Sequence, residues 1–254
     1  MNEIWLIARK DLRSYFASPI AYIIIAFFIF LIGWMFFNFL SMYMQGMQQY
    51  AAVSFGQKPT LTDYVLKPLF GNVNVILLFV VPFITMRLLA EEQRDHTIEL
   101  LVTSPISPLQ IVLGKFLAGL VLVSVLVVMT GIFPAVLAVI AKPDWGVILG
   151  SYVGLFLVSC TYVGIGLFWS SRTDNQIVAA ICSFGTLLFF WLVSWPAHSA
   201  GPIWGDVLTY LSIISHYTNF AQGVLDTTDL IFYVSFTAFS LFLTNLSFDT
   251  FEWS

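Results

Sequence analysis

Charged residues are scarce in this chain of 254 residues: 10 Lys and Arg with 14 Asp and Glu make up only 9% of it, whereas 59% is hydrophobic. An ordinary soluble domain carries roughly 25% charged residues, and the mean hydropathy here is +0.90. The polar surface is too small to cover a water-soluble globule of this size. A soluble enzyme, a disordered chain and a nucleic-acid-binding protein with a basic face are therefore excluded, which leaves an integral membrane protein.

Residues that carry out chemistry are also few. The two cysteines lie inside apolar runs and show no disulfide or metal spacing, and the three histidines are too far apart to suggest a zinc site. A phosphate-binding loop is absent, because Gly114-Lys115 is followed by Phe116 and no glycine stands five positions before Gly114. We expect no catalytic residue and no metal in this chain.

Apolar runs long enough to cross a bilayer occur six times, since each helical crossing needs about 20 mainly apolar residues. The predicted spans cover roughly residues 20–40, 71–90, 109–140, 147–169, 177–195 and 230–246. The third run is longer than a bilayer requires, so either Pro134 kinks it or its end emerges at the outer interface. Residues 41–70 and 196–229 are expected to be outer loops with short helices. The sequence thus predicts an all-α integral membrane protein, a single domain over residues 1–254 with six transmembrane helices.

The Lys and Arg residues of the short loops predict the orientation. With a cytoplasmic N-terminus, the inner side receives Arg9, Lys10, Arg13, Arg87, Arg94, Lys115 and Arg172, and the outer side receives Lys58, Lys67 and Lys142. This asymmetry favours both termini in the cytoplasm. Arg87 and Lys115 lie near inner ends of spans, where long side chains can extend to the headgroup level.

Residues 3–16, which precede the first span, have an amphipathic pattern. Ile4, Ile7 and Leu12 form an apolar side. The charged residues of the segment are Arg9, Lys10, Asp11 and Arg13. This pattern predicts an N-terminal amphipathic interface helix.

The densest charge cluster lies in the inner loop between the second and third spans. Ile98, Leu101 and Val102 recur there at helical spacing, which predicts a short amphipathic helix that ends at Ser104-Pro105. Such a helix offers polar groups to a cytoplasmic partner. On composition alone, an ordinary solvated loop is the alternative.

The order of residues in this loop, EEQRDHTIELLVTSPISPLQIVLGK, resembles the signature of type-2 ABC transporter permeases. The N-terminal segment and the last stretch, residues 211–244, resemble the same family, and gliding-motility-type permeases are the most similar subgroup. The family usually has glycine where this chain has His96. A tight turn is therefore less expected at that position, or it moves.

The resemblance implies that the chain is the transmembrane permease subunit of an exporter-type ABC transporter in the bacterial cytoplasmic (inner) membrane. The chain itself would be no enzyme and would bind no cofactor, since ATP and Mg²⁺ would bind to two copies of a separate cytoplasmic ABC ATPase. A second permease copy or a sister permease, membrane lipids and an extracytoplasmic accessory protein are the other expected partners, and nucleic acid is not. The residues expected to couple the ATPase to the spans, by way of a cytoplasmic coupling helix, are Glu91, Glu92, Arg94, Thr97, Glu99, Leu100, Leu101 and Pro105.

Two other functions are compatible with a six-span chain: an ion-coupled secondary transporter, and a non-transporting membrane complex that transmits force. Ion-coupled carriers generally have an ionisable group in the middle of a span, and no predicted span has one near its centre. This absence speaks against the secondary transporter. The aromatic content of 17% favours an apolar or amphipathic cargo, or mechanical work on an extracytoplasmic partner.

Overall fold

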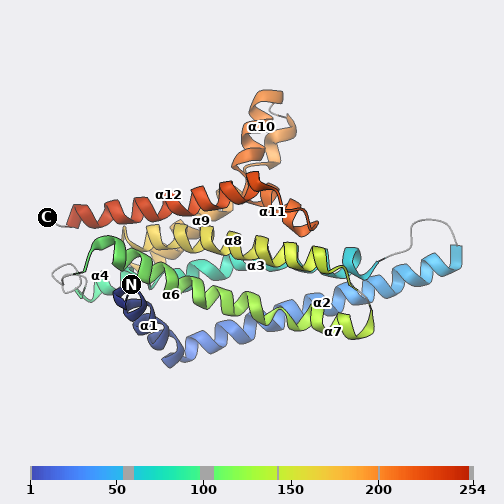
Figure 1. Cartoon of the computed structure of the whole chain (residues 1–254), viewed down its shortest axis with the longest axis horizontal. Helices are drawn as coiled ribbons and strands as arrows, with labels where there is room; N and C mark the ends of the chain where they lie inside the picture. Colours follow the sequence, from blue (N-terminus) through green and yellow to red (C-terminus); the bar gives the residue numbers. More distant parts are fainter. Residues whose placement is uncertain (1, 54–59, 98–105, 142, 200, 252–254) are drawn as a thin grey trace.

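The computed structural model describes residues 2–53, 60–97, 106–141, 143–199 and 201–251. These residues form helices and no strand, which confirms the all-α class. Six helical segments are long and apolar enough to cross a membrane: Pro19–Tyr50, Thr62–Arg94, Pro108–Val139, Trp145–Ser170, Gln176–Ala197 and Thr227–Phe248. They run along one long axis, and both ends of the chain lie at the same end of that axis (Figure 1).

In chain order, the described elements are α1 (Asn2–Ala17), α2 (Pro19–Val53), the π-helical turn η1 (Thr62–Leu66), α3 (Lys67–Thr85), α4 (Ala90–Arg94), α6 (Pro108–Met129), α7 (Ile132–Ile140), α8 (Trp145–Ser170), α9 (Gln176–Leu192), the 3₁₀ turn η2 (Trp195–Ser199), α10 (Pro202–Leu211), α11 (Ile213–Ala221) and α12 (Thr227–Phe251). Short helical segments stand between several of the long helices, at the ends of the spans.

The first span differs from the expectation at its end. α2 continues past Leu40 to Val53, and its last turns extend beyond the rest of the bundle (Figure 1). Residues 41–53 are rich in Met, Gln and Ala, which favour helix without being apolar enough for a membrane span. The expected outer loop over residues 41–70 therefore contains the end of α2, η1 and the start of α3.

The long third run is broken near its C-terminal end. α6 ends at Met129 and α7 begins at Ile132. Pro134 has no N–H to donate to the carbonyl of Thr130, four residues earlier, and its ring would clash with that carbonyl. The N–H groups of Thr130 and Gly131 donate to the carbonyl oxygens of Val127 and Val128, three residues earlier instead of four, so the α-helical hydrogen bonding is interrupted close to Pro134.

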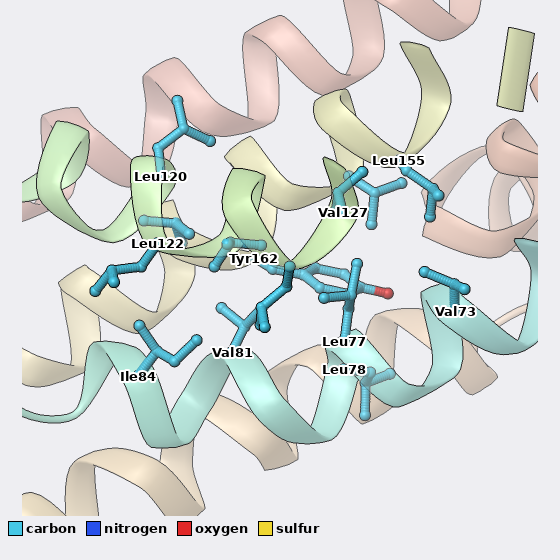
Figure 2. Close-up of a cluster of buried hydrophobic side chains, with 14 of the residues drawn as sticks. Val73, Leu77, Leu78, Val81, Ile84, Leu120, Leu122, Val127, Leu155 and Tyr162 are labelled. Atoms are coloured by element: carbon cyan, nitrogen blue, oxygen red, sulfur yellow. The ribbon is translucent and has the colours of Figure 1, made fainter. Parts of the chain in front are cut away.

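The core of the bundle lies between α3, α6 and α8 (Figure 2). Val73, Leu77 and Val81 of α3 are fully buried against α6 and α8, and so is Tyr162 of α8. The Tyr162 hydroxyl donates to Asn74 Oδ1 at 3.0 Å, so its polar end is satisfied inside the bundle. By contrast, only 11% of the first span is buried, and its apolar outer face is available to lipid.

Gly150 and Gly154 pack against α11 of the same chain. A Cβ atom at Gly154 would lie 2.6 Å from Phe220 Cβ, and one at Gly150 would lie 2.9 Å from Gly223 Cα. These glycines therefore let α8 and α11 approach within the chain, as small residues do in membrane helix packing.

His216 joins the short helices to the last span. Its Nδ1 lies 2.5 Å from Asp229 Oδ1 at the start of α12, and its Nε2 lies 2.8 Å from the carbonyl oxygen of Tyr210 in α10. Asn219 of α11 donates to the other oxygen of Asp229 at 2.8 Å. The segment before the last span thus holds short helices, as expected, and hydrogen bonds fix them to one another.

Candidate functional site

The site lies where α1, α4 and the first half of α6 meet, at the end of the bundle that carries both termini (Figure 1). α1 places Ile7 and Ala8 in the interior and leaves Arg9, Lys10 and Arg13 exposed. The predicted amphipathic character of this helix is confirmed. Its apolar side packs on α6.

Gly114 allows this close packing of α1 on α6. A Cβ atom at Gly114 would lie 2.9 Å from Ile7 Cβ and 3.1 Å from the carbonyl oxygen of Ile4. No side chain larger than hydrogen fits there without moving α1. The next residue, Lys115, consequently points at the buried side of α1.

Lys115 is the centre of an ion-pair cluster formed by Lys10, Asp11, Glu92 and Lys115. Its Nζ lies 2.7 Å from Glu92 Oε1 and 3.1 Å from Asp11 Oδ2, and its side chain is only 3% exposed. Lys10 approaches the same Glu92 oxygen from the exposed side at 3.3 Å. One lysine in a span therefore ties α4 and α1 together.

Burial controls the electrostatics of the ion-pair cluster. A buried ammonium is costly unless opposite charges neutralise it, and two carboxylates neutralise Lys115. Loss of water raises the pKa of the Asp11 carboxyl, with Lys115 acting in the opposite direction. Lys115 is therefore not exposed at the end of its span, because its charge is satisfied inside the chain.

Ser170, the last residue of α8, holds the start of α4. Its Oγ accepts hydrogen bonds from the backbone N–H groups of Leu89 and Ala90, each at 3.0 Å, and donates to the carbonyl oxygen of Met86 at 3.1 Å. The Gln93 side chain donates to the carbonyl oxygen of Ser171 at 2.9 Å. α4 is therefore anchored to α8 on one side and to α6 on the other.

α4 ends in a tight turn at His96. The N–H of Thr97 donates to the carbonyl oxygen of Glu92 at 2.9 Å, and the N–H of His96 donates to that of Gln93 at 3.2 Å. This pair of bonds defines a Schellman cap, whose turn residue is usually glycine. His96 takes the left-handed conformation with φ of 56°, so the expectation that its side chain disfavours a turn here is wrong.

The predicted coupling residues have different environments. Arg94 and Thr97 are exposed, and Glu91 is half-buried. Glu92 forms an ion pair with Lys115. Glu99, Leu100, Leu101 and Pro105 lie outside the described residues. The described part of this loop contains α4, Ala90–Arg94. Ile98, Leu101 and Val102, on which the expected amphipathic helix is based, lie outside the described residues.

Sequence reasoning missed three residues of this site: Lys115, Gln93 and Ser170. The lysine gave a usable signal, because a lone charge several residues inside an apolar span needs an acidic partner. Ser170 and Gln93 gave none, since a serine or glutamine at the end of a helix is ordinary.

The comparisons with known proteins agree with this architecture. The family model described as "ABC-2 family transporter protein" matches residues 5–250, which includes α1, the ion-pair cluster and all six spans. A comparison with curated proteins found no match. Since the match covers nearly the whole chain and the helices have the required number and length, this protein belongs to the ABC-2 family of transporter proteins.

Proposed function

We propose that this chain is the permease subunit of an ATP-driven exporter and that α4 transmits the movement of a separate ATPase subunit to the spans. ATP and Mg²⁺ would bind to two copies of that ATPase. A second copy of this chain or a sister permease would complete the transporter, in the bacterial cytoplasmic membrane with both termini inside. Family membership supports the role as a membrane component, and the subgroup of gliding-motility-type permeases stays a prediction from the loop motif.

The observation that carries the proposal is the position of Lys115. It pairs with Glu92 of α4 and Asp11 of α1 while standing in span α6. A displacement of α4 would therefore move α1 and α6 with it, because separating either pair would leave a buried charge without its partner. The exposed Arg94 and Thr97 are on the same short segment, where a partner protein can reach them.

Energy would enter through differential binding. A nucleotide-loaded ATPase can drive the bundle into another state only if it binds that state more tightly. The ion-pair cluster would make the transmission stiff, since α4 is held by both Lys115 and Ser170. The chain needs no nucleotide site of its own for this role.

Photo-cross-linking tests the proposed contact. A photoreactive amino acid at Thr97, an exposed residue just after the turn that ends α4, should link the chain to a protein that has a phosphate-binding loop. The complex purified in nanodiscs should hydrolyse ATP. The matched control is the same photoreactive amino acid at Trp204 of α10, which is 67% exposed and lies in the segment before the last span. Solute movement in vesicles without ATP, or a Thr97 adduct that hydrolyses no ATP, would contradict the proposal and favour a secondary transporter or a different complex.

The proposed orientation has its own test. A single cysteine at Asp226 should react with an impermeant reagent in intact cells, and one at Asp95 should react only after the membrane is opened. Both positions are exposed. Labelling of the Asp95→Cys variant in intact cells would reverse the proposed topology.

A further inference from the structure

An apolar groove lies between α2, α3 and α6. It has a volume of about 340 Å³, and its walls include Ile24 and Phe27 of α2, Phe83 of α3 and Leu122 of α6. Phe27 is 58% exposed and Phe83 is 57% exposed, so the groove opens sideways toward the membrane. Water would find almost no hydrogen-bond partner there, and hydrocarbon is the filling that the surroundings provide.

The groove leads into a polar pocket at the end of the bundle that carries α1. This pocket has a volume of about 440 Å³. Tyr15, Ser18 and Arg87 line both cavities. The Tyr15 hydroxyl is bound to the carbonyl oxygen of Ile84 at 2.5 Å, which fixes the ring between them. The two cavities together have the form of a lipid site, with an apolar part at hydrocarbon depth and a polar part at the level of the headgroups.

The charges that line the polar pocket are balanced. Three cations and three carboxylates line it: Lys10, Arg87 and Lys115 with Asp11, Glu91 and Glu92. The four members of the ion-pair cluster pair with one another. For Arg87 and Glu91, no ion pair within 4.0 Å occurs among the residues that the structure describes. The pocket thus offers one cation and one carboxylate to a ligand.

Hydroxyl groups complete the polar part. Ser14 and Ser18 line the same pocket, and Ser18 Oγ accepts from the N–H of Ile20 at 3.3 Å, which leaves its own proton available to a ligand. A guanidinium with neighbouring hydroxyls is suited to bind phosphate. The Glu91 carboxylate, which lines the same pocket, is suited to bind an ammonium group.

We propose that these cavities bind one zwitterionic phospholipid with a primary ammonium headgroup, of the phosphatidylethanolamine type, from the leaflet that contains α1. One acyl chain would fill the groove, the phosphate would bind to Arg87, and the ammonium would bind to Glu91. An anionic lipid would satisfy Arg87 and leave Glu91 without a partner. The proposal requires insertion into a membrane and not the coupling to an ATPase, so the two can fail separately.

Native mass spectrometry of the full chain in detergent tests the site. Dioleoyl phosphatidylethanolamine should bind at one tight site, and dioleoyl phosphatidylglycerol and dioleoylglycerol should bind more weakly. Arg87→Gln should weaken both phospholipids by roughly tenfold or more, because a charge-assisted hydrogen bond is lost. Glu91→Gln should weaken only phosphatidylethanolamine and so remove the preference for it. Arg172→Gln, which removes an exposed charge from a loop outside both cavities, is the matched control and should change nothing.

The apolar part is tested on α2. Ile24→Trp should fill the groove and abolish tight binding, whereas Ile23→Trp, on the outer face where the side chain is 65% exposed, should leave it intact. In the unaltered protein, a phosphatidylethanolamine with a photoreactive acyl chain should label residues 20–27 and 79–84. Equal binding by the two tryptophan variants, labelling elsewhere, or equal affinity for both headgroups in the unaltered protein would overturn the proposal.

Discussion

Lys115 of α6 and Glu92 of α4 form a 2.7 Å ion pair between two side chains that are almost fully removed from solvent. The second oxygen of Glu92, Oε2, has no hydrogen-bond partner among the described residues. The geometry therefore depends on Lys115 and Lys10 at the first oxygen. This pair connects the segment that we expect to face the ATPase with the membrane-spanning bundle.

Replacing Lys115 by methionine should destabilise the protein by about 3–5 kcal/mol, because Asp11 would be left as an unpaired buried carboxylate and Glu92 would keep only the exposed Lys10 as its partner. The measurement is the denaturation midpoint of the purified chain in detergent. Arg172→Met, at an exposed position, is the control and should change little. The further exchange of Asp11→Asn and Glu92→Gln should restore part of the loss, and equal midpoints for Lys115→Met and Arg172→Met would refute the role of the cluster.

Ser170→Ala should cost about 1–3 kcal/mol, since the buried N–H groups of Leu89 and Ala90 would lose their acceptor. Ser171→Ala is a matched control. Among the described residues, the Ser171 hydroxyl donates only to the carbonyl oxygen of Phe168, and the backbone oxygen of residue 171 still accepts from Gln93. Hydrogen exchange at Leu89 and Ala90 should accelerate in the first variant and not in the second. Unchanged exchange in both would mean that α4 is held in another way.

His96→Gly should stabilise the turn after α4 by about 1 kcal/mol, because glycine adopts positive φ without the steric cost that a Cβ atom brings. His96→Val should have the opposite sign, as a β-branched residue is strained in that conformation. Thermal unfolding and the exchange rate of the Thr97 amide report the effect. A destabilised glycine variant would show that the contacts of the His96 side chain stabilise the fold by more than its positive φ destabilises it.

The stability of the protein should depend on pH through Asp11. Burial raises the pKa of its carboxyl in the folded state, so the folded protein binds more protons than the unfolded one. The contribution of this group is therefore complete below the ordinary pKa of 3.8 and is lost as pH rises through the raised value. As pH rises from 3.8 through the raised pKa, the stability of Asp11→Asn relative to the unaltered protein should therefore increase. A constant difference in stability would show that Asp11 titrates normally.

Much of the fold was predictable from local properties. Six spans follow from the length of the apolar runs, and α1 follows from the separation of Arg9, Lys10 and Arg13 from Ile7. The sequence did not predict that α2 continues to Val53. Hydropathy identifies segments that suit a membrane, and residues 41–53 are helical but not apolar enough to be identified in this way. The turn at His96 was missed because the hydrogen bonds of a Schellman cap can hold a residue other than glycine at positive φ.

The sequence by itself determined the class of the protein. Each apolar run is long enough to cross a membrane on its own, and this property does not depend on which helices pack against one another. It also placed the dense charge cluster in the loop between the second and third spans. Only the tertiary structure decided which of these charges are exposed and which form ion pairs within the chain. The close contact at Gly114 brings Asp11 of α1 and Glu92 of α4 to the same lysine, and an ion pair depends on distances of a few ångströms between segments that the order of residues leaves open.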